Sequence, residues 1–260
     1  MTTQLLNGLA VEIEGEGEAL LCIHGLGGSS NTWTPLLPAL TGFKVIRPDL
    51  PGSARSSLPS QPLSIERYVD SLEALLASLG VESVHVVAHS MGTIVAQHLA
   101  VRNPGKVRSL ALFGPLVAPP EAGRPGVLAR AELARGGVAS LQEIADAIVK
   151  GATSRETKEL QPAVLALVRE SVMRQSPEGY AQSCEALAGA QAAEIERIAV
   201  PVLLLTGDQD GVALPATVAA MAARIAGCRQ VVLEGCGHWA TYEQPQRCVQ
   251  ELEQFYASIR

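Results

Sequence analysis

The sequence predicts an α/β protein with a mainly parallel sheet flanked by helices. Short apolar runs typical of buried strands recur along the chain, and segments with helical spacing of apolar residues separate them. Such alternation is typical of doubly wound sheets. Of the 260 residues, 47% are hydrophobic and 18% are charged, so the chain can bury a large core as one α/β domain with an insertion.

Eight segments are expected to form strands. The first two flank Asn7-Gly8, a dipeptide that favours a two-residue hairpin turn. The others are apolar runs bounded by turn residues or helical segments. The expected strands cover residues 3–6, 9–14, 19–23, 44–47, 84–89, 107–113, 202–206 and 229–233.

Two helices are especially clear in the sequence. One begins after Ser64, shows a single apolar stripe, and ends at Gly80. The other follows Ser90, because apolar residues recur at helical spacing from Met91 until Asn103-Pro104 stops the helix.

Between Phe113 and Val202 the pattern changes to helices without strands. The run Ser140-Leu141-Gln142-Glu143 predicts a capping box at the start of one helix, and Ser176-Pro177 predicts a capped start of another. We therefore expect residues 1–115 and 200–260 to form the sheet-bearing core. Residues 116–199 are expected to form a helical insertion after the sixth strand.

The fifth expected strand runs into Ala88-His89-Ser90-Met91-Gly92. A buried strand that turns sharply into a helix at a serine exposes the hydroxyl as a nucleophile. We expect the residues two before and two after the serine, Ala88 and Gly92, nearly to touch, which would require both to be small. Taken alone, Ser90 is equally well explained as a helix N-cap.

A glycine-rich turn, His24-Gly25-Leu26-Gly27-Gly28-Ser29, follows the third expected strand. Backbone amides in such a turn can approach a substrate oxygen closely. Attack on an ester or lactone carbonyl places negative charge on that oxygen, and removal of one N–H donor to it costs roughly 3 kcal/mol. We assign the two expected oxyanion donors to the N–H groups of Leu26 and Met91, with His24 bracing the turn.

With these turns in this order, the chain resembles the α/β-hydrolase family, in which the acid and then the histidine follow the serine. The resemblance implies an α/β-hydrolase fold with an eight-stranded sheet and a helical lid formed by the insertion. The family pattern places the acid two residues after a Gly-Asp pair, which selects Asp210 over Asp208. His238, on a glycine-flanked loop after the last expected strand, fits the general base.

Asp210 and His238 each have a plainer interpretation, as a turn aspartate and a loop histidine. Four loops in the family's order, each at the carboxyl end of an expected strand, favour catalysis, because ligands bind at that edge of open α/β sheets. The resemblance thus implies a serine hydrolase acting on a small carboxylic ester or lactone through an acyl-serine. We expect neither a metal nor a cofactor in that mechanism.

The segment 177–181, with Cys184 and Leu187, resembles the lid of 3-oxoadipate enol-lactonases and related esterases. Those enzymes usually carry Gly-x-Ser-Met-Gly-Gly where this chain has Ala-His-Ser-Met-Gly-Thr, a difference that bears on the substrate rather than on the chemistry. An enol-lactone diacid would need a cationic partner. The candidates are Arg155, Arg169 and Arg174, which are otherwise explained as residues of solvated helix faces.

Three alternative functions stay open. A C–C bond hydrolase of ring-cleavage diketones would use a similar fold and triad, although residues 24–28 lack the Gly-Pro-Gly-Ala turn typical of those enzymes. An acyltransferase would replace water by another alcohol. In a hydrolase-like receptor, the same residues would hold a small ligand while the lid recruits a partner protein.

Several other classes are disfavoured. The net charge of −6 argues against a nucleic-acid partner. Ser30 stands at the third glycine position of a dinucleotide fingerprint, and His85 and His89 lack further ligands at zinc spacing.

The expected location is cytoplasmic. The N-terminus shows no signal-peptide pattern, no apolar run reaches membrane-spanning length, and the five cysteines form no CxxC pair. We expect a small-molecule partner and no membrane partner, and the sequence leaves monomer and homo-oligomer equally open.

Overall fold

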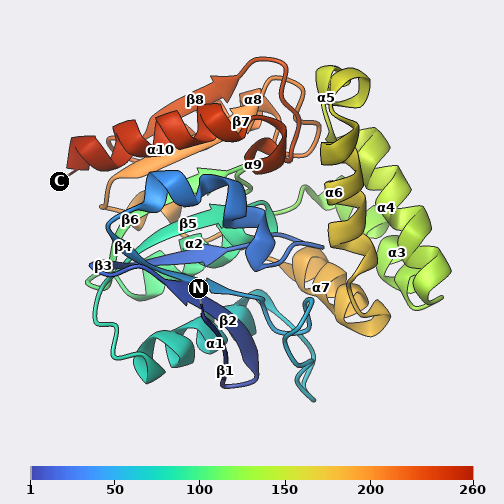
Figure 1. The fold of residues 1–260 in the computed structure, drawn as a ribbon, viewed down its shortest axis with the longest axis horizontal. Coiled ribbons are helices and arrows are strands. Elements are labelled where there is room, and N and C mark those ends of the chain that lie inside the picture. The colour runs from blue at the N-terminus through green and yellow to red at the C-terminus, as the bar shows by residue number, and fades with distance from the viewer. Residues whose placement is uncertain (1, 260) are drawn as a thin grey trace.

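The computed structural model describes residues 2–259, and its centre is one eight-stranded sheet (Figure 1). The strand order is β1-β2-β4-β3-β5-β6-β7-β8, with the β1–β2 and β2–β4 pairs antiparallel and the other pairs parallel. The predicted mainly parallel eight-stranded sheet is therefore confirmed. The strands are β1 (Thr2–Leu6), β2 (Leu9–Glu14), β3 (Glu18–Ile23), β4 (Phe43–Pro48), β5 (Val84–His89), β6 (Val107–Phe113), β7 (Val202–Gly207) and β8 (Arg229–Leu233).

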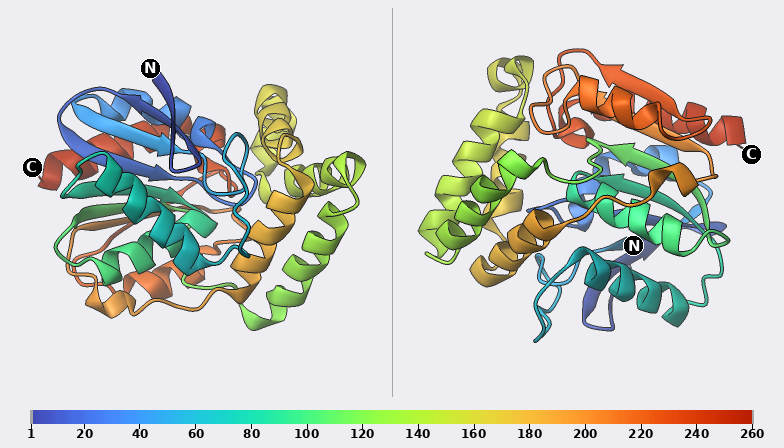
Figure 2. Two further views of the ribbon diagram at one scale, coloured as in Figure 1. Left: turned by 90° about the horizontal axis from the view of Figure 1, so that it is seen from below. Right: turned by 180° about the vertical axis from the view of Figure 1, so that it is seen from behind.

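Helices cover both faces of the sheet. Apolar side chains of α1 (Ile65–Ser78), α2 (Met91–Arg102) and α8 (Pro215–Ala222) pack on one face. A 3-10 segment (Ser30–Leu40) and α10 (Pro245–Ile259) pack on the other. Figure 1 has the second set in front of the sheet, and the view from behind in Figure 2 has the first set in front.

Local sequence signals explain several of these elements. Asn7 and Gly8 have φ angles of 51° and 79°, as the tight β1–β2 hairpin requires, and Leu6 pairs with Leu9 across it. The side chain of Ser64 accepts a hydrogen bond from the N–H of Arg67 and so caps α1. Gly80, with φ 65°, ends the same helix, as predicted.

Between β6 and β7 the chain forms a helical insertion, which lies beyond one end of the sheet (Figures 1 and 2). Part of it has an apolar core of its own, with residues from α3, α4, α6 and α7. The insertion comprises α3 (Arg124–Ala134), α4 (Val138–Ala152), α5 (Arg155–Leu160), α6 (Pro162–Met173) and α7 (Pro177–Gly189). Two short 3-10 turns, Glu121–Gly123 and Ile195–Arg197, flank these helices. Outside the insertion, the short helix α9 (Ala240–Glu243) follows β8. Residues 1 and 260, the outer ends of the expected core segments, lie outside the described residues.

One predicted cap in the insertion is wrong. Helix α4 begins at Val138 with Gly137 as its N-cap, so Ser140 lies inside the first turn instead of starting the helix. The φ of 97° at Gly137 lets the chain turn earlier, and Gly137 also accepts the N–H of Leu141. The predicted start at Ser176-Pro177 is confirmed, because the Ser176 side chain accepts the N–H of Gly179.

No helix between residues 2 and 259 is both long and apolar enough to cross a bilayer.

Candidate active site

Five adjacent strands bring the predicted site residues to one edge of the sheet. β3, β5, β6, β7 and β8 are parallel neighbours, so their carboxyl ends lie side by side. The chain segments that leave these ends carry Leu26, Ser90, Gly114, Asp210 and His238 respectively. Topology therefore assembles residues that are up to 212 positions apart in the sequence.

Ser90 lies at the turn between β5 and α2 in a strained backbone conformation. Its φ of 52° and ψ of −124° are unusual for a residue with a side chain. The hydroxyl makes no helix-capping hydrogen bond, which removes the N-cap interpretation of this serine. The turn therefore presents the hydroxyl to the space above the sheet edge.

A hydrogen-bonded chain joins the serine, the histidine and the acid. The hydroxyl oxygen of Ser90 lies 2.8 Å from Nε2 of His238, and Nδ1 of His238 lies 2.8 Å from Oδ2 of Asp210. With Nδ1–H donating to the carboxylate, Nε2 is free to accept the serine proton. All three residues are buried.

Asp210 is held rigidly on its loop. Its Oδ1 accepts the N–H groups of Val212 and Ala213, at 2.8 and 2.7 Å. Burial opposes ionisation of Asp210, but the adjacent His238 and the hydrogen bonds to the carboxyl lower its pKa to about 2. Asp208, the alternative acid, instead accepts the N–H of Cys236.

The N–H groups of Leu26 and Met91 have no acceptor among residues 2–259. Met91 is the first residue of α2, where an N–H has no carbonyl four residues earlier in the helix. Leu26 follows β3 in a turn closed by the N–H of Gly28 donating to the carbonyl of Gly25. His24 donates from Nδ1 to the Gly25 carbonyl and accepts the Leu50 N–H at Nε2, each at 2.8 Å.

Three positions close to Ser90 and His238 have no room for a side chain, and each is occupied by glycine. A Cβ on Gly25 would lie 2.7 Å from Cβ of Ser90, and one on Gly114 would lie 2.8 Å from Cε1 of His238. A Cβ on Gly92 would lie 2.4 Å from the carbonyl oxygen of Ile23. The end of β3 and His24 therefore require a small residue at Gly92, and the expected close approach of Ala88 to Gly92 stays a prediction.

The loop that carries His238 is fixed from behind by Glu243, which is 3% exposed. Its carboxylate accepts the N–H groups of Gly237 and Trp239, at 3.1 and 3.0 Å, on both sides of the histidine. It also accepts the Ser154 N–H at 2.8 Å and the Thr157 hydroxyl at 2.9 Å. One buried carboxylate therefore joins the histidine loop to the helical insertion.

A second histidine supports the first. Nε2 of His89 lies 2.9 Å from the carbonyl oxygen of His238, to which it donates, and the two ring centroids are 5.0 Å apart. Burial and the nearby His238 lower the pKa of His89 to about 3, so the ring is neutral near pH 7. His85, four residues earlier, instead contacts Ser109. No group of three possible metal-ligating side chains occurs among the described residues.

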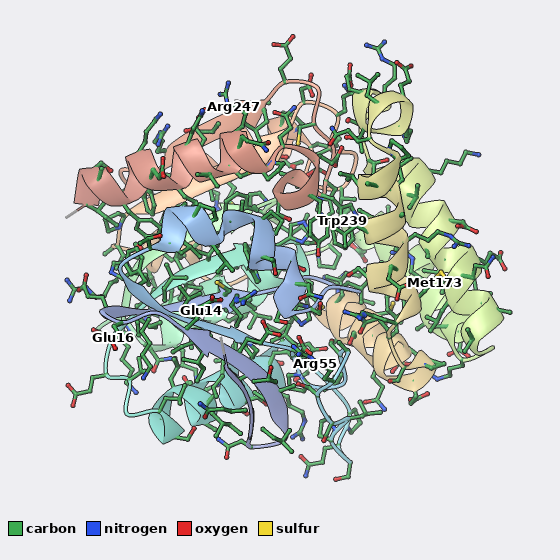
Figure 3. The ribbon with its side chains drawn as sticks, in the orientation of Figure 1. Glu14, Glu16, Arg55, Met173, Trp239 and Arg247 are labelled. Carbon is green, nitrogen blue, oxygen red and sulfur yellow. The ribbon has the colours of Figure 1, made fainter. Side chains whose placement is uncertain are left out.

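A cavity of about 250 Å³ lies over Ser90 and His238. Residues of the core and of α3, α4 and α7 line it. Trp239, one of the lining residues of the core, lies next to α6 (Figure 3). Most lining side chains are apolar, which suits a small ligand with few polar groups. The lining residues are Leu26, Ser90, Leu116, Arg130, Ala147, Ile148, Gly151, Ala152, Leu187, Val212, His238 and Trp239.

The expected cationic residues do not line this cavity. Arg155 pairs with Glu156 and Arg169 with Asp146 at the surface, and Arg174 is exposed. The cavity instead contains Arg130, which the sequence analysis missed. No sequence pattern singles it out, because only Ala131 and Ala134 of α3 are buried and Arg130 does not share a helix face with its sequence neighbour Ala131.

Comparison with known proteins agrees with this architecture. A family model described as alpha/beta hydrolase fold matches residues 18–245. An uncharacterized protein of Mycobacterium tuberculosis is 30% identical over 268 residues, which cover 95% of this chain and 77% of the relative.

Two solved structures are similar over nearly the whole chain. An enol-lactonase from Burkholderia xenovorans has a TM-score of 0.89 and 28% identity, covering 98% of this chain and 100% of the other. A thermophilic esterase from Thermogutta terrifontis has a TM-score of 0.90 and 25% identity, covering 99% and 97%.

Proposed function

The chain belongs to the α/β-hydrolase-fold family, and from this premise we propose that it is a serine hydrolase of small carboxylic esters or lactones. The observation that carries the proposal is the hydrogen-bonded chain from Ser90 through His238 to Asp210, with both distances 2.8 Å. Unpaired N–H groups at Leu26 and Met91 support it as oxyanion donors. The esterase and the enol-lactonase among the similar structures support the ester and lactone class.

The mechanism follows the geometry of these groups. Nε2 of His238 takes the proton of Ser90 as the serine oxygen bonds to the carbonyl carbon, while the carbonyl electron pair moves onto oxygen. The N–H groups of Leu26 and Met91 donate to this oxyanion, and ionised Asp210 stabilises the imidazolium. As the oxyanion collapses, the C–O bond to the alcohol breaks and the alcohol takes the proton from His238.

Hydrolysis of the acyl-serine repeats these steps with water. His238 takes a proton from water as the hydroxide oxygen bonds to the acyl carbon, and it then returns the proton to Ser90 as the acid leaves. For a lactone, the alcohol and the acid stay in one product. In this proposal residues 116–199 act as a lid, which excludes water and shapes the substrate pocket.

The direct test compares the protein with its Ser90→Ala variant on 4-nitrophenyl acetate. We expect multiple turnovers from the unchanged protein and loss of at least about 10³-fold in kcat/KM from the variant. Hydrolysis by Ser90→Ala at an undiminished rate would remove the assignment. A coloured dienol diketone, assayed in parallel, separates ester hydrolysis from C–C bond cleavage, and a single turnover without further product would indicate a receptor.

A further inference from the structure

Arg130 differs from the other arginines of the insertion in its position, and from all of them except the exposed Arg174 in its lack of a carboxylate or carbonyl partner among residues 2–259. Arg135, Arg155 and Arg169 form ion pairs with surface carboxylates. Arg124 instead donates to the carbonyls of Ala188 and Ala190. Among the described residues Arg130 has no carboxylate partner, and it is half-buried in the wall of the cavity over Ser90.

The immediate surroundings of Arg130 do not neutralise its charge. The nearby charge of Arg130 favours the ionised forms of Tyr180 and Cys184, but burial has the larger effect and raises the pKa of both groups. Both side chains therefore stay uncharged and do not balance the charge of Arg130. A guanidinium beside an apolar cavity is poorly solvated, so an anion placed there is favoured. Trp239 also lines the cavity, and its buried Nε1–H has no acceptor among residues 2–259.

We propose that Arg130 determines specificity by binding a carboxylate of the substrate, so that the preferred substrate is a small ester or lactone that carries a negative charge. This inference rests on the proposed serine-hydrolase function and adds its substrate class. A planar guanidinium matches a carboxylate through two parallel hydrogen bonds, which fixes orientation as well as affinity. Ser90 and Arg130 line the same cavity, so the bound carboxylate and the reacting carbonyl would share one space.

The test uses two pairs of esters, each with a charged member and a neutral isostere. 4-Acetoxybenzoate and 4-nitrophenyl acetate differ in the charge on the alcohol side, because a nitro group has the shape of a carboxylate. Monoethyl glutarate and ethyl 5-methylhexanoate differ in the charge on the acyl side. The variants are Arg130→Gln, Arg130→Lys and, as the matched control, Arg174→Gln, which removes an exposed arginine outside the cavity.

We expect Arg130→Gln to lower kcat/KM for at least one charged ester by about 10- to 100-fold, mainly through KM. The kcat/KM for its neutral isostere should change by less than about twofold. Arg130→Lys should retain part of the preference for the charged ester, and Arg174→Gln should leave kcat/KM for both esters unchanged. Equal losses on charged and neutral esters would mean a structural role. That result, or an unchanged preference in both pairs, overturns the inference.

Failure of the proposed function gives a different result. If Ser90→Ala retains hydrolysis, or if the protein cleaves none of the four esters, the serine mechanism is wrong. Calorimetric binding of the four esters to Ser90→Ala then decides the role of Arg130. The inference is supported if Ser90→Ala binds a charged ester more tightly than its neutral isostere and if adding Arg130→Gln to this variant abolishes the difference. Equal binding of both members of each pair overturns it.

Discussion

Gly114 lies directly against the imidazole of His238 and has a φ of 55°. A methyl group there would be 2.8 Å from Cε1, so the ring would have to shift, which disturbs its 2.8 Å contact with Ser90. We predict that Gly114→Ala lowers kcat/KM on 4-nitrophenyl acetate by on the order of 10²-fold, because small displacements of reacting groups are costly. Gly105→Ala is the control, since a Cβ there meets open space. Equal activity of the two variants would contradict the predicted displacement.

The charge on Asp210 makes stability depend on pH. The folded pKa of about 2 lies below the ordinary value of 3.8, so the ionised group stabilises the folded state above about pH 4. That contribution is lost as the pH falls toward 2. We predict that the protein and Asp210→Asn differ less in their free energy of unfolding at pH 3 than at pH 5, by about 1 kcal/mol. Urea unfolding at the two pH values measures this difference. A gap that is independent of pH would be inconsistent with this charge.

Ser90, Asp210 and His238 could be predicted from sequence because each lies on a short loop directly after a strand, and local composition reports such loops. Arg130, Gly114 and Glu243 could not be found in this way. Their roles depend on contacts between segments that the chain brings together only on folding, such as Gly114 under His238. A single sequence contains no signal for that distance.

At the scale of elements, Glu243 joins α9 to the histidine loop and to the residues that precede α5. Glu243→Gln replaces one acceptor oxygen with an amide NH2 group, which is itself a donor and faces the donors that the carboxylate binds. Buried N–H groups are then left without an acceptor. We predict a loss of about 2 kcal/mol in the free energy of unfolding, together with a fall in kcat that exceeds the change in KM. Calorimetry and steady-state kinetics measure the two effects.

The matched control for Glu243 is Glu253→Gln on the exposed side of α10. This substitution should change stability by less than about 0.5 kcal/mol and leave kcat unchanged. If Glu243→Gln behaved in the same way, the buried carboxylate would not be positioning the histidine loop.

The elements themselves were largely predictable. Periodicity located all eight strands to within a residue or two, and Ser64 and Gly80 correctly marked the ends of α1. The error at Ser140 has a clear cause, because Gly137 offered an earlier start that a capping pattern does not register. Strand order could not be read from the sequence either, since β4 lies between β2 and β3 by long-range pairing.

At the scale of the whole molecule, the cavity lies between the core and the helical insertion. An occupant would contact Ala147 and Ile148 of α4 as well as Ser90, and so oppose separation of the two parts. We predict that phosphonylation of Ser90 slows amide hydrogen exchange in α3 and α4 and leaves α10 unchanged. Equal slowing in α10, which packs on the opposite face of the core sheet from α1 and α2, would point to a general change in stability.

We propose that His238 makes Ser90 reactive, and covalent labelling is the sharpest test of this role. After treatment with diethyl 4-nitrophenyl phosphate, peptide mass spectrometry should find one diethylphosphoryl group, bound to Ser90. The labelling rate should fall by on the order of 10³-fold in His238→Gln. Labelling of a different residue with loss of activity, or labelling of Ser90 that is equally fast in His238→Gln, would contradict the account.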